Sequence, residues 1–438
     1  METGTRTTKL NFINYGLRVV GLAVIGWALC LPVPVWAGEG AADGGANGDA
    51  NGDANGDIAR LLDDGEVSLS FRYRFEGVDQ DGFSADAEAS TVRSRLSLQS
   101  GEYRGVDFLV EVDDVRELGP DNFNAGAGNT PDRTAYPVVA DPEGSELNQA
   151  YVDYQGHDDW TLRVGRQRIN LDNQRFVGGV GWRQNEQTFD AVSLAYAGER
   201  VTGFYAWVDD VRRIFGEDVP AGSHDQDGTH LLNLSGDLPG VGRLAGYYYL
   251  VDNENDSSFS TSTLGARLTG RQEIAEKTEL RYELEYAYQS DAGDNPDDYN
   301  TDYGKLGLGL ARGHYDLGVG WELLGGDADA LGYEAFRTPL ATLHAFNGWA
   351  DAFLSTPAAG LDDRYVEFKA TRGRYLAQAR YHDFSAEDGG GSLGEELDLR
   401  VGCKVDDRLR VDLFYADFDG DAGLADRSKF WAMLQLAL

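Results

Sequence analysis

The segment TELRYELEYAYQ, at residues 278–289, alternates apolar and polar side chains along nearly its whole length. Leu280 and Tyr282 begin the apolar series, whereas Glu279 and Arg281 begin the polar series. Because successive side chains of a strand point to opposite faces, this period of two predicts a β-strand with one apolar and one polar face. Similar segments recur up to the last residue, and almost no other type of element separates them.

A chain built from such strands is typical of an outer-membrane β-barrel, in which apolar faces turn toward lipid and polar faces line a water-filled lumen. We count eighteen candidate strands from residue 65 onward. The predicted fold is therefore all-β, a transmembrane antiparallel barrel of about 18 strands over residues 65–438. The first strand, VSLSFRYRF at 67–75, places Arg72 and Arg74 on the lumenal face.

The connections between the expected strands alternate in length. Short connections are expected at 101–104, 156–159, 198–200, 313–314, 373–374 and 406–408, and long ones at 117–145, 169–187, 209–228 and 324–360. Outer-membrane barrels combine short periplasmic turns with longer extracellular loops. This alternation places both ends of the barrel domain on the periplasmic side and the long loops outside the cell.

The N-terminal residues resemble a secretory signal. Basic residues beginning at Arg6 precede an apolar run at 19–31, and VWA at 35–37 forms a small-residue cleavage site. We therefore expect a signal peptide at residues 1–37 and a bacterial outer-membrane location. Residues 38–64 are rich in Gly, Asn and Asp, which do not build a core, so we expect a flexible low-complexity tail.

Acidic residues strongly outnumber basic ones. The 438 residues include 74 Asp and Glu against 38 Lys and Arg, and the formal net charge is −36. Nucleic acid is disfavoured as a partner, because it needs concentrated basic charge. The acids gather at 79–81, 252–256 and 294–298, in expected loops. There they are either simply solvated or bridge divalent cations to lipopolysaccharide phosphates.

Arginines concentrate in the segment around 165–196, against the acidic background of the chain. Arginine forks suit carboxylates, and nearby amides suit sugar hydroxyls. The expected substrate path consists of Arg72, Arg74, Arg93, Arg95, Arg163, Arg166, Arg168, Arg175, Arg183, Asn173 and Gln184. Alternatively, the arginines pair with acids such as Asp153, Asp172 and Glu186 and hold the barrel wall rigid. The residues alone favour neither interpretation.

A second segment, FRTPLATLHAFNGWADAFL at 336–354, is long and nearly uncharged for an exposed loop. We expect it to fold into the barrel mouth as a constriction or lid. Its candidate residues are Arg337, His344, Phe346 and Trp349. The aromatic side chains would either stack on sugar rings or simply pack against the wall.

Three segments together resemble signature segments of the alginate export porin family of Gram-negative bacteria. They are GRQRINLDNQRFVGGVGWRQNEQTFDA, NQAYVDY and TPLATLHAFNGWADAFL, and the resemblance covers roughly 66–438. It implies an eighteen-stranded barrel whose positive lumen passes an anionic uronate polymer, with Arg166, Arg168, Arg175 and Arg183 as leading contacts. Such a path requires most acids of this chain to lie on loops and turns.

The expected function is a passive outer-membrane channel for an anionic, alginate-like polysaccharide or oligosaccharide. No nucleotide motif, metal cluster or nucleophile elbow is visible, so we expect no cofactor and no enzymatic activity. The expected partners are the saccharide, outer-membrane lipid and lipopolysaccharide, and periplasmic export components. The alternatives are a general or cation-preferring porin, in which Glu283, Glu285, Asp316 and Glu322 dominate the lumen, and an outer-membrane barrel enzyme.

Overall fold

The computed structural model describes residues 64–438 with the exception of Asp158 and Leu331. The expected signal peptide at 1–37 and tail at 38–64 therefore fall outside the described residues, apart from Asp64.

In this described part of the chain, eighteen antiparallel strands form one sheet. The strands are β1 (Glu66–Gln80), β2 (Ala87–Gln99), β3 (Val106–Asn122), β4 (Gly144–His157), β5 (Trp160–Gln167), β6 (Thr188–Ala197), β7 (Val201–Arg212), β8 (Ser223–Leu238), β9 (Gly242–Val251), β10 (Thr261–Ala275), β11 (Thr278–Asp291), β12 (Asn300–Arg312), β13 (Tyr315–Leu324), β14 (Leu361–Arg372), β15 (Tyr375–Ser385), β16 (Ser392–Lys404), β17 (Leu409–Gly420) and β18 (Arg427–Ala437). Short 3₁₀ helices occur at η2 (Pro220–Gly222), η3 (Ser257–Phe259) and η4 (Leu343–Ala345). Among the described residues, no helix has the length and apolar character needed to cross a membrane.

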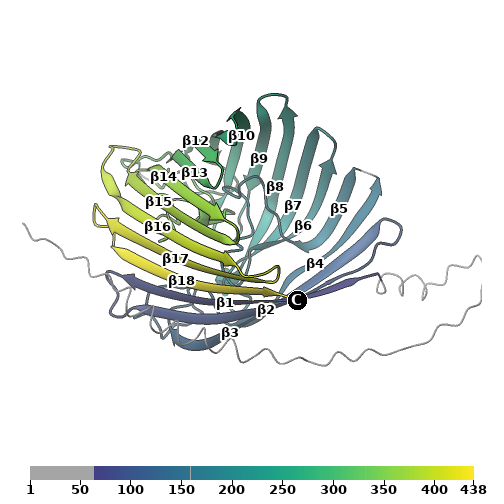
Figure 1. Ribbon diagram of the computed structural model, residues 1–438, viewed down its shortest axis with the longest axis horizontal. Coiled ribbons are helices and arrows are strands. Elements are labelled where there is room, and N and C mark those ends of the chain that lie inside the picture. The colour runs from purple at the N-terminus through teal and green to yellow at the C-terminus, as the bar shows by residue number, and fades with distance from the viewer. Residues whose placement is uncertain (1–63, 158, 331) are drawn as a thin grey trace, which may run out of the picture. The chain divides into compact units, whose positions relative to one another are not determined.

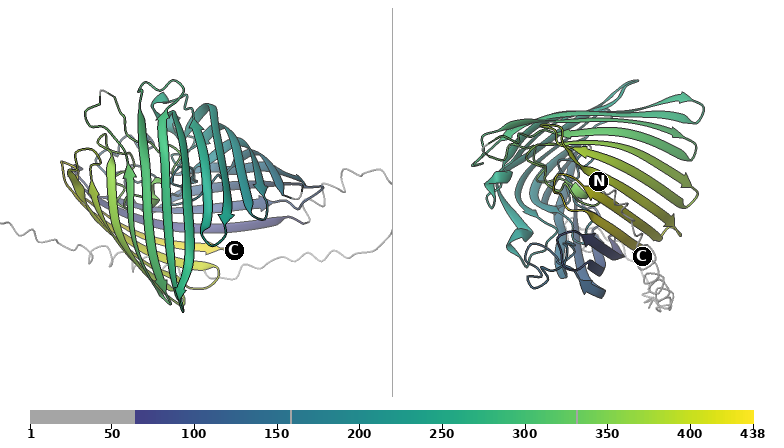
Figure 2. Two further views of the ribbon diagram at one scale, coloured as in Figure 1. Left: turned by 90° about the horizontal axis from the view of Figure 1, so that it is seen from above. Right: turned by 90° about the vertical axis from the view of Figure 1, so that its left-hand side faces the viewer.

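The sheet closes on itself through its first and last strands. Each strand pairs with its sequence neighbours, and β1 pairs with both β2 and β18, so that Arg72 lies between Arg93 and Gln435. In Figure 1 the purple strands β1 to β3 continue directly into the yellow strand β18, and Figure 2 shows the same wall from two further sides. Closure leaves no strand edge without hydrogen-bond partners, as a lipid environment requires.

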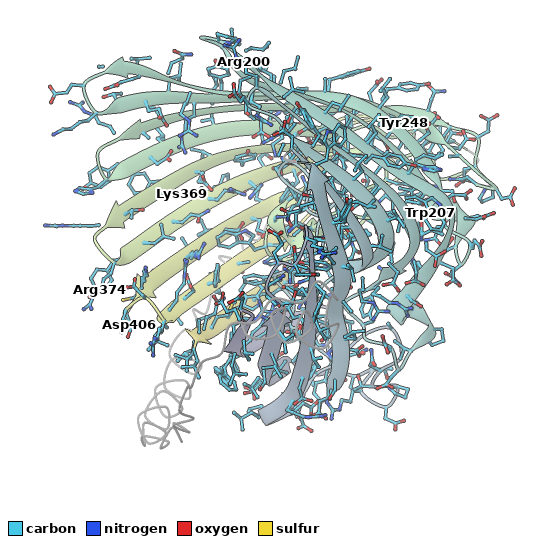
Figure 3. The ribbon with its side chains drawn as sticks, turned by 90° about the vertical axis from the view of Figure 1, so that its right-hand side faces the viewer. Arg200, Trp207, Tyr248, Lys369, Arg374 and Asp406 are labelled. Atoms are coloured by element: carbon cyan, nitrogen blue, oxygen red, sulfur yellow. The ribbon has the colours of Figure 1, made fainter. Side chains whose placement is uncertain are left out.

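The two faces of the wall confirm the predicted inverted arrangement. Leu306, Leu308 and Leu310 on β12 turn outward, with 42%, 47% and 42% of their surface exposed. The outward series also includes Trp207 on β7 and Tyr248 on β9, which are labelled in Figure 3. Polar residues such as Lys305 and Glu285 alternate with the apolar ones and are buried inside the barrel.

Short and long connections alternate as predicted. The turns that follow even-numbered strands are short, and Arg374 and Asp406 lie in two of them (Figure 3). The loops that follow odd-numbered strands include 168–187 and 325–360, close to their expected limits.

Two loops are shorter than predicted. They span 123–143 and 213–222, because strands β3, β7 and β8 extend further than their apolar alternation does. Backbone pairing continues there through polar residues such as Asp210 and Asp225, with a bulge between Val208 and Asp210. Hydrogen bonding between strands does not need an apolar face above the membrane. The alternation of apolar residues therefore predicted these strands to be shorter than they are.

The largest cluster of buried apolar side chains lies inside the barrel. It joins loop residues, among them Phe176, Phe336 and Trp349, to inward-facing wall residues such as Tyr303 and Trp431. The loops at 168–187 and 325–360 thus contribute the packed interior that a soluble protein would place between layers of secondary structure.

We expect Leu308→Arg to destabilise the barrel by about 2 to 4 kcal/mol, because its lipid-facing cation must leave water. Gly307→Arg adds the same group to the lumenal face of the same strand, beside Glu283 and in an open cavity, and should be tolerated. Urea unfolding in lipid vesicles, followed by the electrophoretic mobility shift of folded barrels, measures both. Equal destabilisation by the two variants would contradict the assigned faces.

Candidate functional site

Two long loops meet inside the barrel. We call residues 168–187 loop L3 and residues 325–360 loop L7, after their order among the long loops. Val177 of L3 and Leu340 of L7 form a short parallel β-bridge. The backbone N–H of Gly178 donates to the Leu340 carbonyl at 2.9 Å. The two loops therefore form one unit across the lumen.

A glycine is needed at this junction. The backbone N–H of Thr342 donates to the Gln174 carbonyl at 3.0 Å, which brings the chains very close together. A Cβ at Gly178 would lie 2.3 Å from the Thr342 hydroxyl oxygen. Any larger side chain at Gly178 would push L3 and L7 apart.

Loop L3 crosses the whole lumen to reach the opposite wall. Phe176 packs against Tyr247 of β9 and Tyr303 of β12, with ring centroids 5.3 Å and 5.2 Å away. Beside it, Arg175 Nε lies 2.7 Å from a carboxylate oxygen of Glu322 on β13. L3 leaves the wall at β5 and returns at β6, so it narrows the channel from side to side.

Aromatic rings line the other end of the junction. Trp182 of L3 stacks on His344 of L7 at 4.1 Å between ring centroids. Edge-on contacts join Trp182 to Phe414 of β17 and to Trp431 of β18. Trp349 of L7 is 91% buried and meets Phe414 edge-on at 5.5 Å. These contacts hold L3 and L7 against the wall near the barrel closure.

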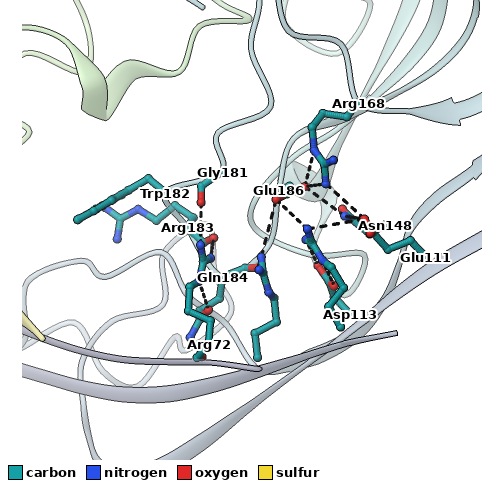
Figure 4. A network of polar contacts seen from close by, with 12 residues as sticks. Arg72, Glu111, Asp113, Asn148, Arg168, Gly181, Trp182, Arg183, Gln184 and Glu186 are labelled. Carbon is teal, nitrogen blue, oxygen red and sulfur yellow. Dashed lines mark hydrogen bonds and ion pairs between the residues drawn. The ribbon is translucent and has the colours of Figure 1, made fainter. Parts of the chain in front are cut away.

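An ion network surrounds Glu186, near the C-terminal end of L3 (Figure 4). Its carboxylate lies 3.0 Å from Arg95 Nη1 and 3.8 Å from Arg93 Nη1, both on β2. Arg168, at the start of L3, donates its Nε–H to the same carboxylate at 2.8 Å, and Asn148 of β4 donates at 3.2 Å. Glu111 and Asp113 of β3 bind the same arginines, since Arg95 lies 2.6 Å from Asp113 and Arg168 lies 3.3 Å from Glu111. Three guanidinium groups and three carboxylates thus form one network.

The charges around Glu186 determine its ionisation. Burial by itself would raise the pKa of this carboxyl, but Arg95, Arg168 and Arg93 overcome that effect and lower its pKa to about 2. Glu186 is therefore an anion at any physiological pH, and its negative charge is divided among the three neighbouring arginines.

Arg72 of β1 binds L3 through neutral groups. Its Nη1 donates to the Gly181 carbonyl at 2.8 Å, and its Nε donates to the Gln184 side-chain oxygen at 2.9 Å. It also donates to the Arg183 carbonyl. Arg93 extends this pattern by donating to the Gln184 carbonyl at 3.1 Å. All three guanidinium nitrogens of Arg72 therefore hold L3, and the side chain is buried.

A second set of ion pairs fixes L3 against β1. Arg74 of β1 lies 2.6 Å from Glu76 and 3.2 Å from Asp141, measured between nitrogen and carboxylate oxygen. Arg183 of L3 joins Glu76 at 3.1 Å and Asp351 of L7 at 3.3 Å. These arginines are structural clamps, since their charges are satisfied by buried acids.

Asp351 is the anchor of L7. Lys429 Nζ of β18 and His344 Nδ1 lie 2.6 Å and 2.7 Å from its carboxylate. Burial would raise the pKa of Asp351, but Lys429, His344 and Arg183 hold it well below its usual range. Removing any one of these partners would leave buried charge uncompensated.

Arg166 lies elsewhere than expected. It falls on the face of β5 that carries Leu162 and Val164, whose surfaces are 38% and 49% exposed. Arg166 pairs there with Asp190 at 2.8 Å and Glu217 at 3.0 Å. Its even position gives Arg166 the parity of these outward residues, but its side chain also lines the crevice that contains Glu186. The expected role of Arg166 in the substrate path stays a prediction.

Several arginines pair with acids, as the alternative interpretation predicted. Arg163 of β5 lies 2.6 Å from Asp153 of β4, and Arg168 pairs with Glu186 as described. Asp172, the third expected acid, instead accepts a hydrogen bond from Asn233 of β8 at 2.6 Å.

The remaining expected residues also support the loops. Asn173 donates to Glu283 of β11 at 3.3 Å, and Arg337 lies 2.7 Å from Asp297. Phe346 faces the Arg175 guanidinium, 4.8 Å from its ring centroid. Arg337 is 40 residues from Asp297 in sequence, so only folding reveals this pair.

Open space remains around the two loops. On the periplasmic side, a cavity of about 630 Å³ lies beside Arg72, Arg93 and Arg410, and its lining holds five basic and two acidic residues. On the opposite wall, a cavity of about 1010 Å³ is lined by five basic and five acidic residues. A crevice of about 20 Å³ lies between Glu186, Arg166 and Glu217 on the extracellular side. The Glu186 network borders this crevice, where L3 returns to the wall at β6.

Sequence reasoning missed several residues of this lumen. Arg400 and Arg410 both bind Asp412 beneath the loops, and Lys429 holds Asp351. Alternation had identified strands β16 and β17, so the parity of Arg400 and Arg410 could have marked them as inward-facing. Lys429 and Asp351 are 78 residues apart, and no local pattern joins them. No group of three or more His, Cys, Asp or Glu side chains in residues 64–438, as far as these are described, is arranged to hold a metal ion.

Sequence comparison gives the family. Residues 65–325, more than half of the chain, match the sequence profile described as alginate export. The chain belongs to the alginate export family. The matched region includes all of L3, whereas the segment at 338–354 in L7 lies beyond it. The comparison with curated proteins gave no match.

Solved structures share the fold of this alginate export family member. The outer membrane protein OpdK of Pseudomonas aeruginosa aligns with a TM-score of 0.67 at 14% identity, covering 86% of this chain and 99% of OpdK. OccAB4 of Acinetobacter baumannii gives 0.67 at 14%, with coverages of 86% and 98%. OpdL of Pseudomonas aeruginosa gives 0.65 at 17%, with coverages of 86% and 99%. Family and fold identify an outer-membrane channel barrel of the bacterial envelope.

We expect the Glu186→Gln variant to lose less folding stability than the unmodified protein as the pH falls. The pKa of Glu186 is lower in the folded protein than its ordinary value of 4.5, so its contribution is present above that value and is lost as pH falls toward 2. The contribution at neutral pH is about 3 kcal/mol. Urea midpoints between pH 2 and 6 measure it. Exposed Glu254→Gln is the control, and identical pH profiles for both variants would contradict the assignment.

Asp351→Asn should loosen L7. Its buried cationic partners lose their counter-ion, at a cost of about 3 to 5 kcal/mol to the loop. We expect larger and noisier single-channel conductance in a planar bilayer, whereas Asp327→Asn, an exposed position of the same loop, should leave the trace unchanged. A quiet, wild-type conductance for Asp351→Asn would show that this anchor does not hold the constriction.

Proposed function

We propose that this barrel is a passive channel for an anionic saccharide, with an alginate-like polyuronate as the substrate class. The observation that carries the proposal is the gathering of Arg93, Arg95 and Arg168 around Glu186 where L3 returns to the wall. Glu111 and Asp113 of β3 complete this network of three guanidinium groups and three carboxylates. A transported carboxylate meets there the same guanidinium groups that Glu186 already occupies.

Exchange of carboxylates accounts for passage at this point. A uronate carboxylate that displaces Glu186 from Arg95 or Arg93 replaces lost hydration by charge-assisted hydrogen bonds. Glu186 then competes for the same donors and promotes release. Conduction requires binding that is favourable at entry and weak enough for exit, and an internal competitor supplies this balance.

Arg72 and Arg93 continue the path toward the periplasm. Both line the cavity of about 630 Å³, in which basic residues outnumber acidic ones. The acidic segments 252–256 and 294–298 lie in loops between strands, away from this wall. The lumen is not free of acids, since Glu285, Glu322 and Glu396 are buried inside the barrel. The locally positive route is confined to the side that Arg72, Arg93 and Arg410 line.

Other parts of the chain fit a secreted channel. We propose that residues 1–37 are removed as a signal peptide and that residues 38–64 form a periplasmic tail. Outer-membrane lipid, divalent cations at the acidic loops and periplasmic export components are the further partners of the proposal.

A general porin is the second candidate. The cavity of about 1010 Å³ along β8 to β15 has equal numbers of acidic and basic residues in its lining, so small solutes of either charge would pass there. The fold and the family favour a channel over an enzyme. His382 of β15 lies 2.7 Å from Asp363 and 3.7 Å from Asp398, both on the barrel wall.

Arg93→Gln combined with Arg95→Gln should shift the channel toward cations. The double variant leaves Glu186 with fewer counter-ions and removes two donors for substrate, so block by mannuronate oligomers should weaken by about tenfold or more. Reversal potentials under a salt gradient and oligomer block in planar bilayers measure both effects.

Arg372→Gln combined with Arg374→Gln is the matched control. These arginines are exposed near a periplasmic turn and change the net charge by the same amount. If this control shifts reversal potential and block equally, selectivity follows the overall field and the arginine path is wrong. Cation preference of the unmodified protein without block would favour the general porin.

A further inference from the structure

A separate cavity lies directly beneath the junction of L3 and L7. It measures about 350 Å³ and is lined by loop residues Trp182, His344 and Trp349 and by wall residues that include Arg400 and Arg410. It shares four lining residues with the larger cavity on the periplasmic side. The two spaces therefore adjoin, and this cavity is reached from the side of the short turns.

The charges of this cavity are unbalanced. Arg400 of β16 and Arg410 of β17 both bind the single carboxylate of Asp412, at 2.8 Å and 2.6 Å. Arg72, a third guanidinium in the lining, binds neutral acceptors of L3. The lining thus holds three arginines and one acid, in a chain in which acids predominate.

The two arginines keep donors free for a ligand. Both engage Asp412 through Nε and Nη2, which leaves the Nη1 group of each guanidinium for a further acceptor. The side chains of Arg400 and Arg410 are 23% and 45% exposed. A carboxylate bound there would contact two guanidinium groups whose positions Asp412 already fixes.

An aromatic surface lies next to these donors. Arg400 stacks over the Phe414 ring at 4.8 Å, and Trp349 meets the same ring at 5.5 Å. Ligand sites typically combine an apolar wall with a few convergent polar groups. A six-membered ring that carries a carboxylate matches this combination in both size and chemistry.

We propose that this cavity is a binding subsite for one ring-borne carboxylate, with the carboxylate on Arg400 and Arg410 and the ring against Trp349 and Phe414. The natural ligand is a terminal uronate unit that approaches from the periplasm. The identity of the ligand as a uronate rests on the proposed function, whereas the binding of a ring-borne carboxylate in general does not. The subsite would hold the polymer end just below the Glu186 network.

The test is calorimetric titration of the folded full-length barrel in detergent. Glucuronate, glucose and acetate are the probes, because they separate the carboxylate from the ring. We expect glucuronate to bind, and glucose and acetate each to bind at least about tenfold more weakly. An alginate trimer that binds more tightly than glucuronate identifies the polymer end as the source, and equal binding identifies a free monocarboxylate.

Variants assign the binding to the cavity. Arg400→Gln and Arg410→Gln should each weaken glucuronate binding by about tenfold, and each leaves Asp412 with one remaining arginine. Arg380→Gln is the matched control, since Arg380 also faces inward, binds one carboxylate at 2.5 Å and stacks on a tyrosine ring at 5.0 Å. The electrophoretic mobility shift of folded barrels confirms that each variant is folded.

The outcomes separate this subsite from the channel proposal. Equal weakening by Arg380→Gln, or equal binding of glucose, would overturn the subsite even if the channel prefers anions. Binding that depends on Arg400 and Arg410 in a channel without anion preference would support the subsite and reject the polyuronate path. Wild-type affinity in both Arg400→Gln and Arg410→Gln would overturn the subsite directly.

Discussion

The requirement that no backbone group be left unpaired in hydrocarbon governs this structure. An unsatisfied N–H or C=O costs several kcal/mol in lipid, and pairing of β1 with β18 removes the last free edges. A closed wall with apolar residues outside leaves its polar series facing inward. The longest loops can then bury their apolar residues only inside the barrel, which is where L3 and L7 form the constriction.

Charge then decides how the constriction is held and what it can bind. Glu186 and Asp351 each draw cations from strands distant in sequence, so the same contacts position the loops and place guanidinium groups in the lumen. Under the proposed function, rigid support and substrate recognition are not competing explanations for these arginines. An arginine held by a protein carboxylate is already desolvated and oriented, and it can exchange that carboxylate for another.

Sequence patterns predicted the wall better than the site. Alternation placed Arg72 and Arg74 inward. The alternative that arginines pair with acids such as Asp153 and Glu186 holds for Arg163 and Arg168. Arg166 was grouped with its neighbours although its parity matches Leu162 and Val164. The strand ends at Gln167, and beyond it the chain enters the lumen, so parity stops applying to Arg168. Sequence reasoning missed Arg400 and Arg410 because they lie far from the arginine-rich segment at 165–196.

The sequence by itself determined the closed barrel, its strand number and the alternation of short turns with long loops. These follow from local rules, because a period of two and the spacing of turns act between near neighbours. Only the tertiary structure decided which carboxylate meets which arginine. Arg183 reaches Asp351 across 168 residues, and such pairs depend on the curvature of the wall and on how two loops cross the lumen, which no local pattern encodes.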